Sequence, residues 1–149
     1  MEIFISVIAL VISVVSGAFS FYTFVWTARR DRKQATLDAY NQLQEQAFDY
    51  LNHFRPSQIA DIAQNPRSEE YKELGGYIAR IEHFCVGVNQ KIYDREIVYE
   101  LGHGYFDGGV RHRIEPVIER KNSLGIDFYE NIHKVYKWMD EETERRKRN

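Results

Sequence analysis

The sequence predicts an all-α protein in which one N-terminal transmembrane helix precedes a small cytoplasmic helical domain. Three observations predict this architecture. Residues 3–26 carry no charge and are mostly apolar, the apolar residues after residue 29 recur three or four positions apart, and no segment alternates with the two-residue period of a strand. A chain of 149 residues is long enough for one domain. We therefore divide it into an anchor, residues 1–28, and a helical domain, residues 29–149.

The composition excludes several classes of protein. The mean hydropathy is -0.51, whereas several membrane spans would make this value positive. A net charge of -2 is atypical of proteins that bind duplex nucleic acid, which are usually basic, so we expect no such partner. The single cysteine excludes an intramolecular disulfide and any zinc site built from several cysteines.

The apolar run is long enough to cross a bilayer. It has 24 residues, of which 18 are hydrophobic. As a helix it would extend roughly 36 Å, more than the ~30 Å of a hydrocarbon core, and Tyr22 and Trp26 would lie at one interface. A cleaved signal peptide is the alternative, but such peptides begin with basic residues and have a shorter apolar stretch. We therefore expect a retained anchor, with the lipid bilayer as a partner.

Charges beside the run predict its orientation. Arg29, Arg30, Arg32 and Lys33 follow the apolar residues, and only Asp31 opposes them. Basic residues concentrate on the cytoplasmic side of single spans. We expect the N-terminus outside and residues 29–149 in the cytoplasm, where a lone thiol is kept reduced.

Small residues form a stripe along the predicted span. Ala9, Ser13 and Gly17 recur every fourth position, with Ser16 and Ser20 on or beside the same face. This spacing lets helix backbones approach closely, so it predicts a homo-oligomer. The alternative is that these residues pack against nothing, since serine and glycine are common in spans.

The span continues into an amphipathic helix. No proline or glycine interrupts residues 29–54, so we predict one rod from residue 3 to about residue 54, ended by Pro56. Its apolar positions are three or four apart: Leu37, Tyr40, Leu43, Ala47, Leu51 and Phe54.

Four further helices are predicted after Pro56, beside a short one at residues 57–64. Ser68 should cap a long helix whose buried face is Tyr71, Leu74, Ile78, Ile81, Cys85, Val88 and Ile92. Asp94 should cap residues 95–101, and Pro116 should kink or restart the helix over residues 110–122. Asp127 should cap the last helix, with Tyr129, Ile132, Tyr136 and Met139 facing inward.

No catalytic motif is recognisable in the sequence. It contains no P-loop, dinucleotide fingerprint, HExxH or GxSxG motif, so we expect no enzyme, no cofactor and no metal. Cys85 lies on the apolar face of its helix, which favours a buried structural thiol over a nucleophile.

Residues 102–113 are the candidate ligand-binding segment. Four glycines fall within eight residues, followed by arginines at a predicted helix start. Free backbone amides, a helix N-terminus and two guanidinium groups would bind a phosphate. The alternative is an ordinary turn between helices with surface arginines. The candidate ligand residues are His103, Tyr105, Arg111, His112, Arg113 and Arg120.

Two stretches resemble a known family. Residues 77–88 read YIARIEHFCVGV, residues 92–96 read IYDRE, and a helix ending in Arg120 precedes an aromatic-rich final helix. This pattern resembles a bacterial family catalogued as domain of unknown function number 4760, in which one span precedes a small helical domain. The resemblance implies a bacterial inner-membrane location, makes Glu82, Asp94 and Arg120 the polar members of the pattern, and implies no chemistry. The architecture alone is also similar to CRISPR-associated membrane effectors that bind cyclic oligoadenylate.

Three functional hypotheses follow. The first is a non-enzymatic oligomer whose cytoplasmic domain senses a ligand or partner and couples that event to the membrane. The second is an antiviral effector that binds a cyclic oligoadenylate and perturbs the membrane. The third is a membrane-tethered enzyme, which is the least favoured because the sequence offers no nucleophile, base or metal set.

Overall fold

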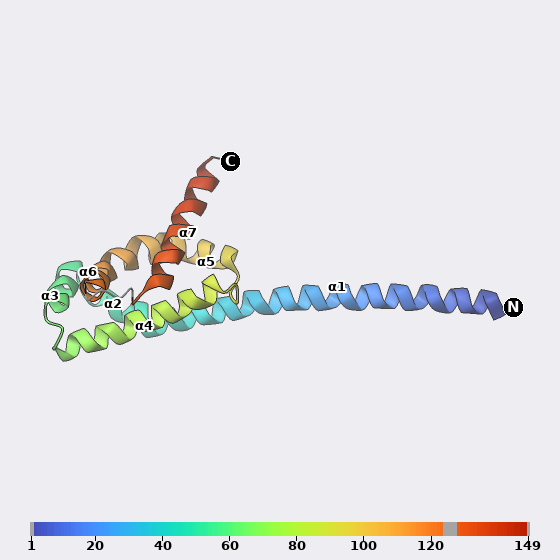
Figure 1. Ribbon diagram of the computed structural model, residues 1–149, viewed down its shortest axis with the longest axis horizontal. Helices are drawn as coiled ribbons and strands as arrows, with labels where there is room; N and C mark the ends of the chain where they lie inside the picture. Colours follow the sequence, from blue (N-terminus) through green and yellow to red (C-terminus); the bar gives the residue numbers. More distant parts are fainter. Residues whose placement is uncertain (1, 124–127, 149) are drawn as a thin grey trace.

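The protein is a small helical bundle built around one end of a long helix (Figure 1). The computed structural model describes residues 2–123 and 128–148. Its elements are α1 (Glu2–Leu43), the π-helix η1 (Gln44–Phe48), α2 (Asp49–Asn52), α3 (Pro56–Gln64), α4 (Glu69–Asn89), α5 (Arg95–Gly102), the π-helix η2 (His103–Val110), α6 (Arg111–Asn122) and α7 (Glu130–Lys147). No strand occurs within these two ranges, which confirms the all-α prediction.

The predicted rod is confirmed. α1, η1 and α2 follow one another without interruption, so a single helical rod extends from Glu2 to Asn52. Its N-terminal half projects from the bundle (Figure 1), and large apolar side chains there are exposed, Phe4 and Phe19 by 72% and 71%. In the described part of the chain it is the one helix long and apolar enough to cross a membrane, and is therefore a candidate span.

The C-terminal half of the rod forms one wall of the core. Phe48 is fully buried, and its ring packs against Phe106 of η2 and against Tyr40 on the preceding turns of the rod. Leu51, three residues further along the rod, is also fully buried. Leu37 and Phe54, predicted to face the core, are only half-buried. The domain is thus assembled around the rod, so the rod cannot move independently of the core packing.

Most predicted caps are confirmed. The side chain of Ser68 accepts a hydrogen bond from the Tyr71 amide at 3.1 Å, and Asp94 accepts from the amides of Glu96 and Ile97 at 3.1 and 3.3 Å. Side-chain acceptors at this position satisfy amides that lack a partner within the helix. Asp127, the predicted cap of α7, lies outside the described residues. The inward residues predicted for α7 are all buried, namely Tyr129, Ile132, Tyr136 and Met139.

The predicted extension of α4 to Ile92 is wrong. α4 ends at Asn89, and Ile92 is 61% exposed. The Ile92 amide donates to the Gly87 carbonyl at 3.0 Å and the Lys91 amide to the Val88 carbonyl at 3.2 Å, which together form a Schellman motif. Lys91 takes the left-handed conformation that this motif requires, with φ at 59°.

The turn between helices, the alternative interpretation of the glycine-rich segment at residues 102–113, is not formed. Residues 103–110 form η2, which joins α5 to α6 in an uninterrupted helical path. Phe106 and Val110 are buried on the inner face of η2, and this burial favours a helical path despite the glycines. Arg111 is therefore not at a free helix start. Pro116 lies inside α6, which continues past it, so this proline does not restart the helix.

Candidate functional site

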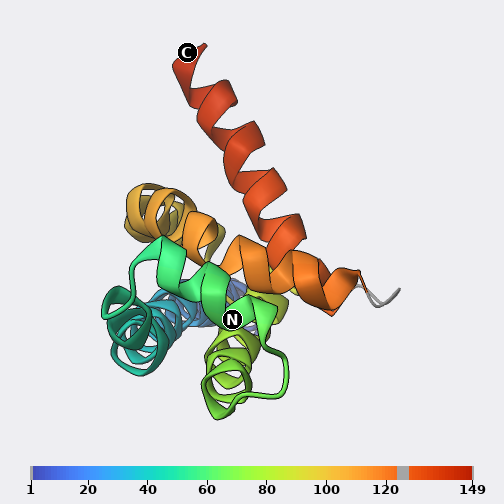
Figure 2. The same ribbon diagram turned by 90° about the vertical axis from the view of Figure 1, so that its left-hand side faces the viewer.

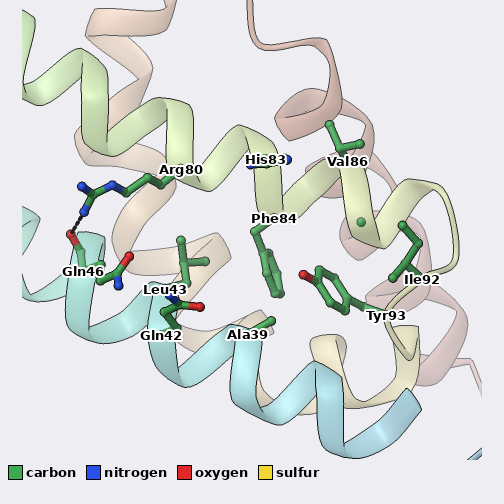
Figure 3. A pocket seen from close by; sticks show the side chains of 11 residues that line it. Ala39, Gln42, Leu43, Gln46, Arg80, His83, Phe84, Val86, Ile92 and Tyr93 are labelled. Atoms are coloured by element: carbon green, nitrogen blue, oxygen red, sulfur yellow. Dashed lines mark hydrogen bonds between the residues drawn. The ribbon is translucent and has the colours of Figure 1, made fainter. Parts of the chain in front are cut away.

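A groove between α1 and α4 is the candidate functional site (Figure 3). Its cavity volume is about 310 Å³. The rod contributes Ala39, Gln42, Leu43 and Gln46, α4 contributes Arg80, His83, Phe84, Val86 and Gly87, and the turn after α4 contributes Ile92 and Tyr93. One wall of this α1–α4 groove is therefore the same helix that forms the candidate span.

Two stacked aromatic rings form the inner end of the groove. The centroids of Phe84 and Tyr93 are 5.1 Å apart with an interplanar angle of 21°. This arrangement depends on Gly87, because a Cβ atom there would lie 2.3 Å from Cε2 of Tyr93. The Schellman motif after α4 brings Tyr93 back over Gly87. Local backbone geometry thus builds an apolar floor.

Polar groups line the rest of the groove. Arg80 Nη1 donates to the Gln46 carbonyl oxygen at 3.3 Å, and its guanidinium lies 5.3 Å from the centroid of the Tyr77 ring. Gln42 and His83 are exposed on opposite walls (Figure 3). The combination of an aromatic floor with amide, imidazole and guanidinium groups suits a ligand with an apolar body and a hydrogen-bonding end.

The described residues show no constellation for catalysis or metal binding beside this groove. Cys85 follows Phe84 in α4 but is fully buried, and burial raises the pKa of its thiol well above the usual value. A protonated, inaccessible thiol is a poor nucleophile. Residues 2–123 and 128–148 hold no group of three metal-ligating side chains.

A second groove, between α6 and α7, holds one of the predicted ligand residues. Arg111 Nη1 donates to Asp107 at 2.9 Å and to Asp140 at 3.2 Å, and its guanidinium lies 4.9 Å from the centroid of the Tyr136 ring. Two carboxylates already neutralise this guanidinium. The hydroxyl of Tyr136 is buried and has no hydrogen-bond partner within the described chain.

The other predicted ligand residues do not converge on Arg111. Arg113 Nη1 donates instead to the Leu51 carbonyl and to Asn52 Oδ1, at 3.2 and 2.6 Å, where it stabilises the end of the rod. The His103 ring stacks on Tyr99, Tyr105 packs against Phe48, and His112 and Arg120 are exposed. Residues 103–110 form the π-helix η2, so the backbone of the glycine-rich segment is part of a helix and not of an open loop. The predicted phosphate cradle is therefore not formed.

The small-residue stripe faces outward. Ala9, Ser13, Ser16, Gly17 and Ser20 are all exposed. A Cβ atom at Gly17 would meet no atom of the described chain within 4 Å. The face is thus accessible to another helix.

Two of the three polar residues on which the family resemblance depends are helix caps. Glu82 Oε1 accepts from the Asn131 amide at 3.1 Å and Oε2 accepts from the Ile132 amide at 2.9 Å, so a residue of α4 caps the start of α7. Asp94 caps α5, as described above. The Arg120 side chain is exposed on α6. Two polar residues of the family pattern therefore have a structural role, because they cap helices.

Sequence reasoning did not identify the α1–α4 groove. Gln42 contributes to it from the rod and lies in no recognisable motif. Arg80 and Tyr93 lie in the two stretches that carry the family resemblance, but the pattern of those stretches indicates helix packing and not a cavity.

Comparisons with known proteins support the family and no activity. A family model described as "Domain of unknown function (DUF4760)" matches residues 9–139. No curated protein and no solved structure matches the chain, and the likeness to CRISPR-associated effectors is not shown by these comparisons. The match includes most of the apolar half of α1 and most of the helical domain, and the chain belongs to the DUF4760 family.

Proposed function

We propose that this chain is a non-enzymatic, single-pass membrane protein that couples occupancy of the α1–α4 groove to its membrane span. The N-terminal half of α1 is the anchor, and the helical domain lies in the cytoplasm. A small ligand or a segment of a partner protein occupies the groove, and the rod transmits that event to neighbouring copies in the bilayer.

The observation that carries this proposal is the continuity of the rod. Ala39, Gln42 and Leu43 line the groove, and the same unbroken helix includes the exposed apolar segment. Any occupant of the groove therefore contacts the rod directly. An occupant that binds better to one α1–α4 spacing than to another shifts the population toward that spacing, and the rod moves with it.

Charges and aromatic residues support the position of the anchor. The guanidinium of Arg30 lies 5.6 Å from the centroid of the Trp26 ring, where the apolar segment ends and the basic residues begin. Tryptophan and arginine in this order are typical of a cytoplasmic membrane interface.

Anchoring and orientation are tested with one variant. Ser57 is exposed on α3, whereas Cys85 is buried, so Ser57→Cys adds one reactive thiol and the unmodified chain gives the background. We expect a membrane-impermeant maleimide to label Ser57→Cys only after the bacterial cells are lysed, and the protein to remain with the membranes in alkali. Labelling in intact cells would overturn the orientation, and release by alkali would overturn the anchor.

Coupling is tested by filling the groove. In a chain that carries Ser13→Cys within the span, we expect His83→Trp to change the yield of disulfide-linked dimer in lipid vesicles, because the indole occupies the α1–α4 groove. His112→Trp, at an exposed position on α6, is the matched control and should leave the yield unchanged. Equal yields from two folded variants would contradict coupling.

A further inference from the structure

The connection between α4 and α5 lies at the end of the domain nearest the apolar half of the rod (Figure 1). It is fixed there by Thr36, which is fully buried; its Oγ1 donates to the Arg32 carbonyl at 2.7 Å and accepts from the Asp94 amide at 2.8 Å. Thr36 follows Trp26 by ten residues, so the connection lies about 15 Å along the rod from the interfacial tryptophan.

The tip of this connection combines an exposed apolar side chain with a cation. Ile92 is 61% exposed, although the residue at its place in a Schellman motif frequently packs back on the helix. Lys91 precedes it, also exposed, in a left-handed conformation that glycine would adopt at lower cost. The turn therefore exposes a lysine and an isoleucine next to each other, at the end of the domain from which the span leaves (Figure 1).

The adjoining part of the rod has the same charge. Arg29, Arg30, Arg32 and Lys33 are all exposed between Trp26 and Thr36, and Asp31 is the one acidic residue among them. Headgroups extend roughly 5–7 Å beyond the hydrocarbon core, which leaves the turn about 10 Å from them, near the Debye length of ~8 Å. A tilt of the rod toward the turn shortens that distance, and spans are commonly tilted by about 20° and by up to about 40°.

We propose that the turn at residues 90–93 is a second membrane contact, which docks on anionic lipid headgroups with Lys91 as the cation and Ile92 inserted at the interface. This inference rests on the anchor proposed above. The positive charge of the rod and of the turn favours an anionic bilayer surface as the occupant. Because the hydrogen bonds of Thr36 fix the connection to the rod, docking of the turn on the bilayer would also fix the tilt of the rod.

The test uses the full chain in vesicles, with a fluorophore attached to Ile92→Cys. Ser57→Cys in α3, at the opposite end of the domain (Figure 1), is the matched control position. We expect headgroup-spin-labelled lipid to quench position 92 in vesicles that contain phosphatidylglycerol, and much less in pure phosphatidylcholine. Position 57 should be quenched in neither. Lys91→Gln in the Ile92→Cys chain should lower the ratio of docked to free turn about fivefold.

The outcomes separate this inference from the anchor. Flotation with vesicles reports the anchor, so a chain that does not float overturns the proposed function. A chain that floats while position 92 is quenched no more than position 57 overturns the docking alone. Equal quenching at position 92 in neutral and anionic vesicles, or no effect of Lys91→Gln, overturns the recognition of anionic lipid.

Discussion

Two glycines of α4 have opposite roles, and alanine at each position separates them. Gly87→Ala would place a Cβ atom 2.3 Å from the Tyr93 ring, so the ring must leave its stacked position against Phe84. We expect a loss of about 1–3 kcal/mol in the free energy of unfolding, because overpacking displaces neighbouring side chains. Urea denaturation of the full chain in detergent measures this loss.

The matched control is Gly76→Ala in the same helix. A Cβ atom at Gly76 would meet no described atom within 4 Å. Alanine is the better helix former, so this variant should gain about 0.5–1 kcal/mol. Changes of the same sign in the two variants would contradict the packing described for Tyr93.

Glu82 joins α4 to α7 through charge-assisted hydrogen bonds. Besides the two amides that it caps, its Oε1 accepts from the side chain of Asn131 at 2.7 Å. Glu82→Gln removes the charge and should cost about 1.5–3 kcal/mol, with faster amide hydrogen exchange in the first turns of α7. Asp61→Asn, at an exposed position on α3, is the control and should change neither quantity. Unchanged exchange in Glu82→Gln would show that another group holds α7.

At the scale of elements, the small-residue stripe of α1 makes a separate prediction. Gly17→Leu adds a bulky side chain to a face that has no neighbour within the described chain, so folding of the domain should be unaffected. If the stripe is a contact between copies, crosslinked oligomers should decrease while membrane insertion persists. Val11→Ala, on the opposite face of the helix, is the control. Equal oligomer yields from the two variants would show that the stripe is not the interface.

Helix content was predictable where apolar spacing and capping agree. In α4, Ser68 marks the start and the three-to-four spacing marks the buried face, and both predictions are confirmed. The end of α4 was not predictable, since a lysine instead of a glycine occupies the left-handed position of its Schellman motif. At η2 the glycines favoured a loop, which is not what forms. Burial of Phe106 and Val110 outweighs the cost of placing glycine in a helix, roughly 1 kcal/mol per residue.

The candidate site was less predictable than the fold, and the reason is distance along the chain. Gln42 and Arg80 line the same groove from α1 and α4, which are separated in the sequence by η1, α2 and α3. Glu82 caps a helix that begins about fifty residues later. Arg111 and Arg113, by contrast, are neighbours in sequence, but a helical path directs them to different partners. Local spacing therefore indicates faces of helices, and tertiary packing decides what each face meets.

At the scale of the whole molecule, buried tyrosines connect separate elements and make the fold sensitive to alkali. Tyr40 in the rod donates to the Leu101 carbonyl of α5 at 3.1 Å, and Lys121 of α6 donates to the Tyr129 hydroxyl at 2.6 Å. Burial raises the pKa of Tyr40, and likewise that of Tyr129, from 10.0 to about 12.

A raised pKa fixes the direction of the pH dependence. Both phenols stay protonated in the folded chain at pH values where the unfolded chain ionises, so their contribution is complete below pH 10 and is lost as the pH rises toward 12. We expect the stability of the full chain in detergent to fall across this window, measured by circular dichroism together with tyrosinate absorbance. Tyr40→Phe should make the fall smaller. A flat profile between pH 10 and 12 would contradict these burials.

The last helix ends away from the bundle. Figure 2 shows the C-terminal turns of α7 projecting beyond the other helices. Within them Arg145 and Arg146 both bond Glu142, Arg146 also bonds Glu100 of α5, and Lys147 bonds Glu144. The acidic and basic halves of the tail thus neutralise each other along the helix, leaving little net charge for a separate anionic partner.

The unbroken rod also gives its two ends a common angular phase. A helix turns about 100° per residue, so one residue inserted in the neck at residues 27–35 would rotate the small-residue stripe by about 100° relative to the α1–α4 groove. Seven inserted residues would return it to within about 20°. The length of the neck therefore sets both the distance between the stripe and the groove and the angle between them around the helix axis. A change of one residue in its length would turn the small-residue stripe away from its present direction relative to the groove while leaving the contacts within the helical domain intact.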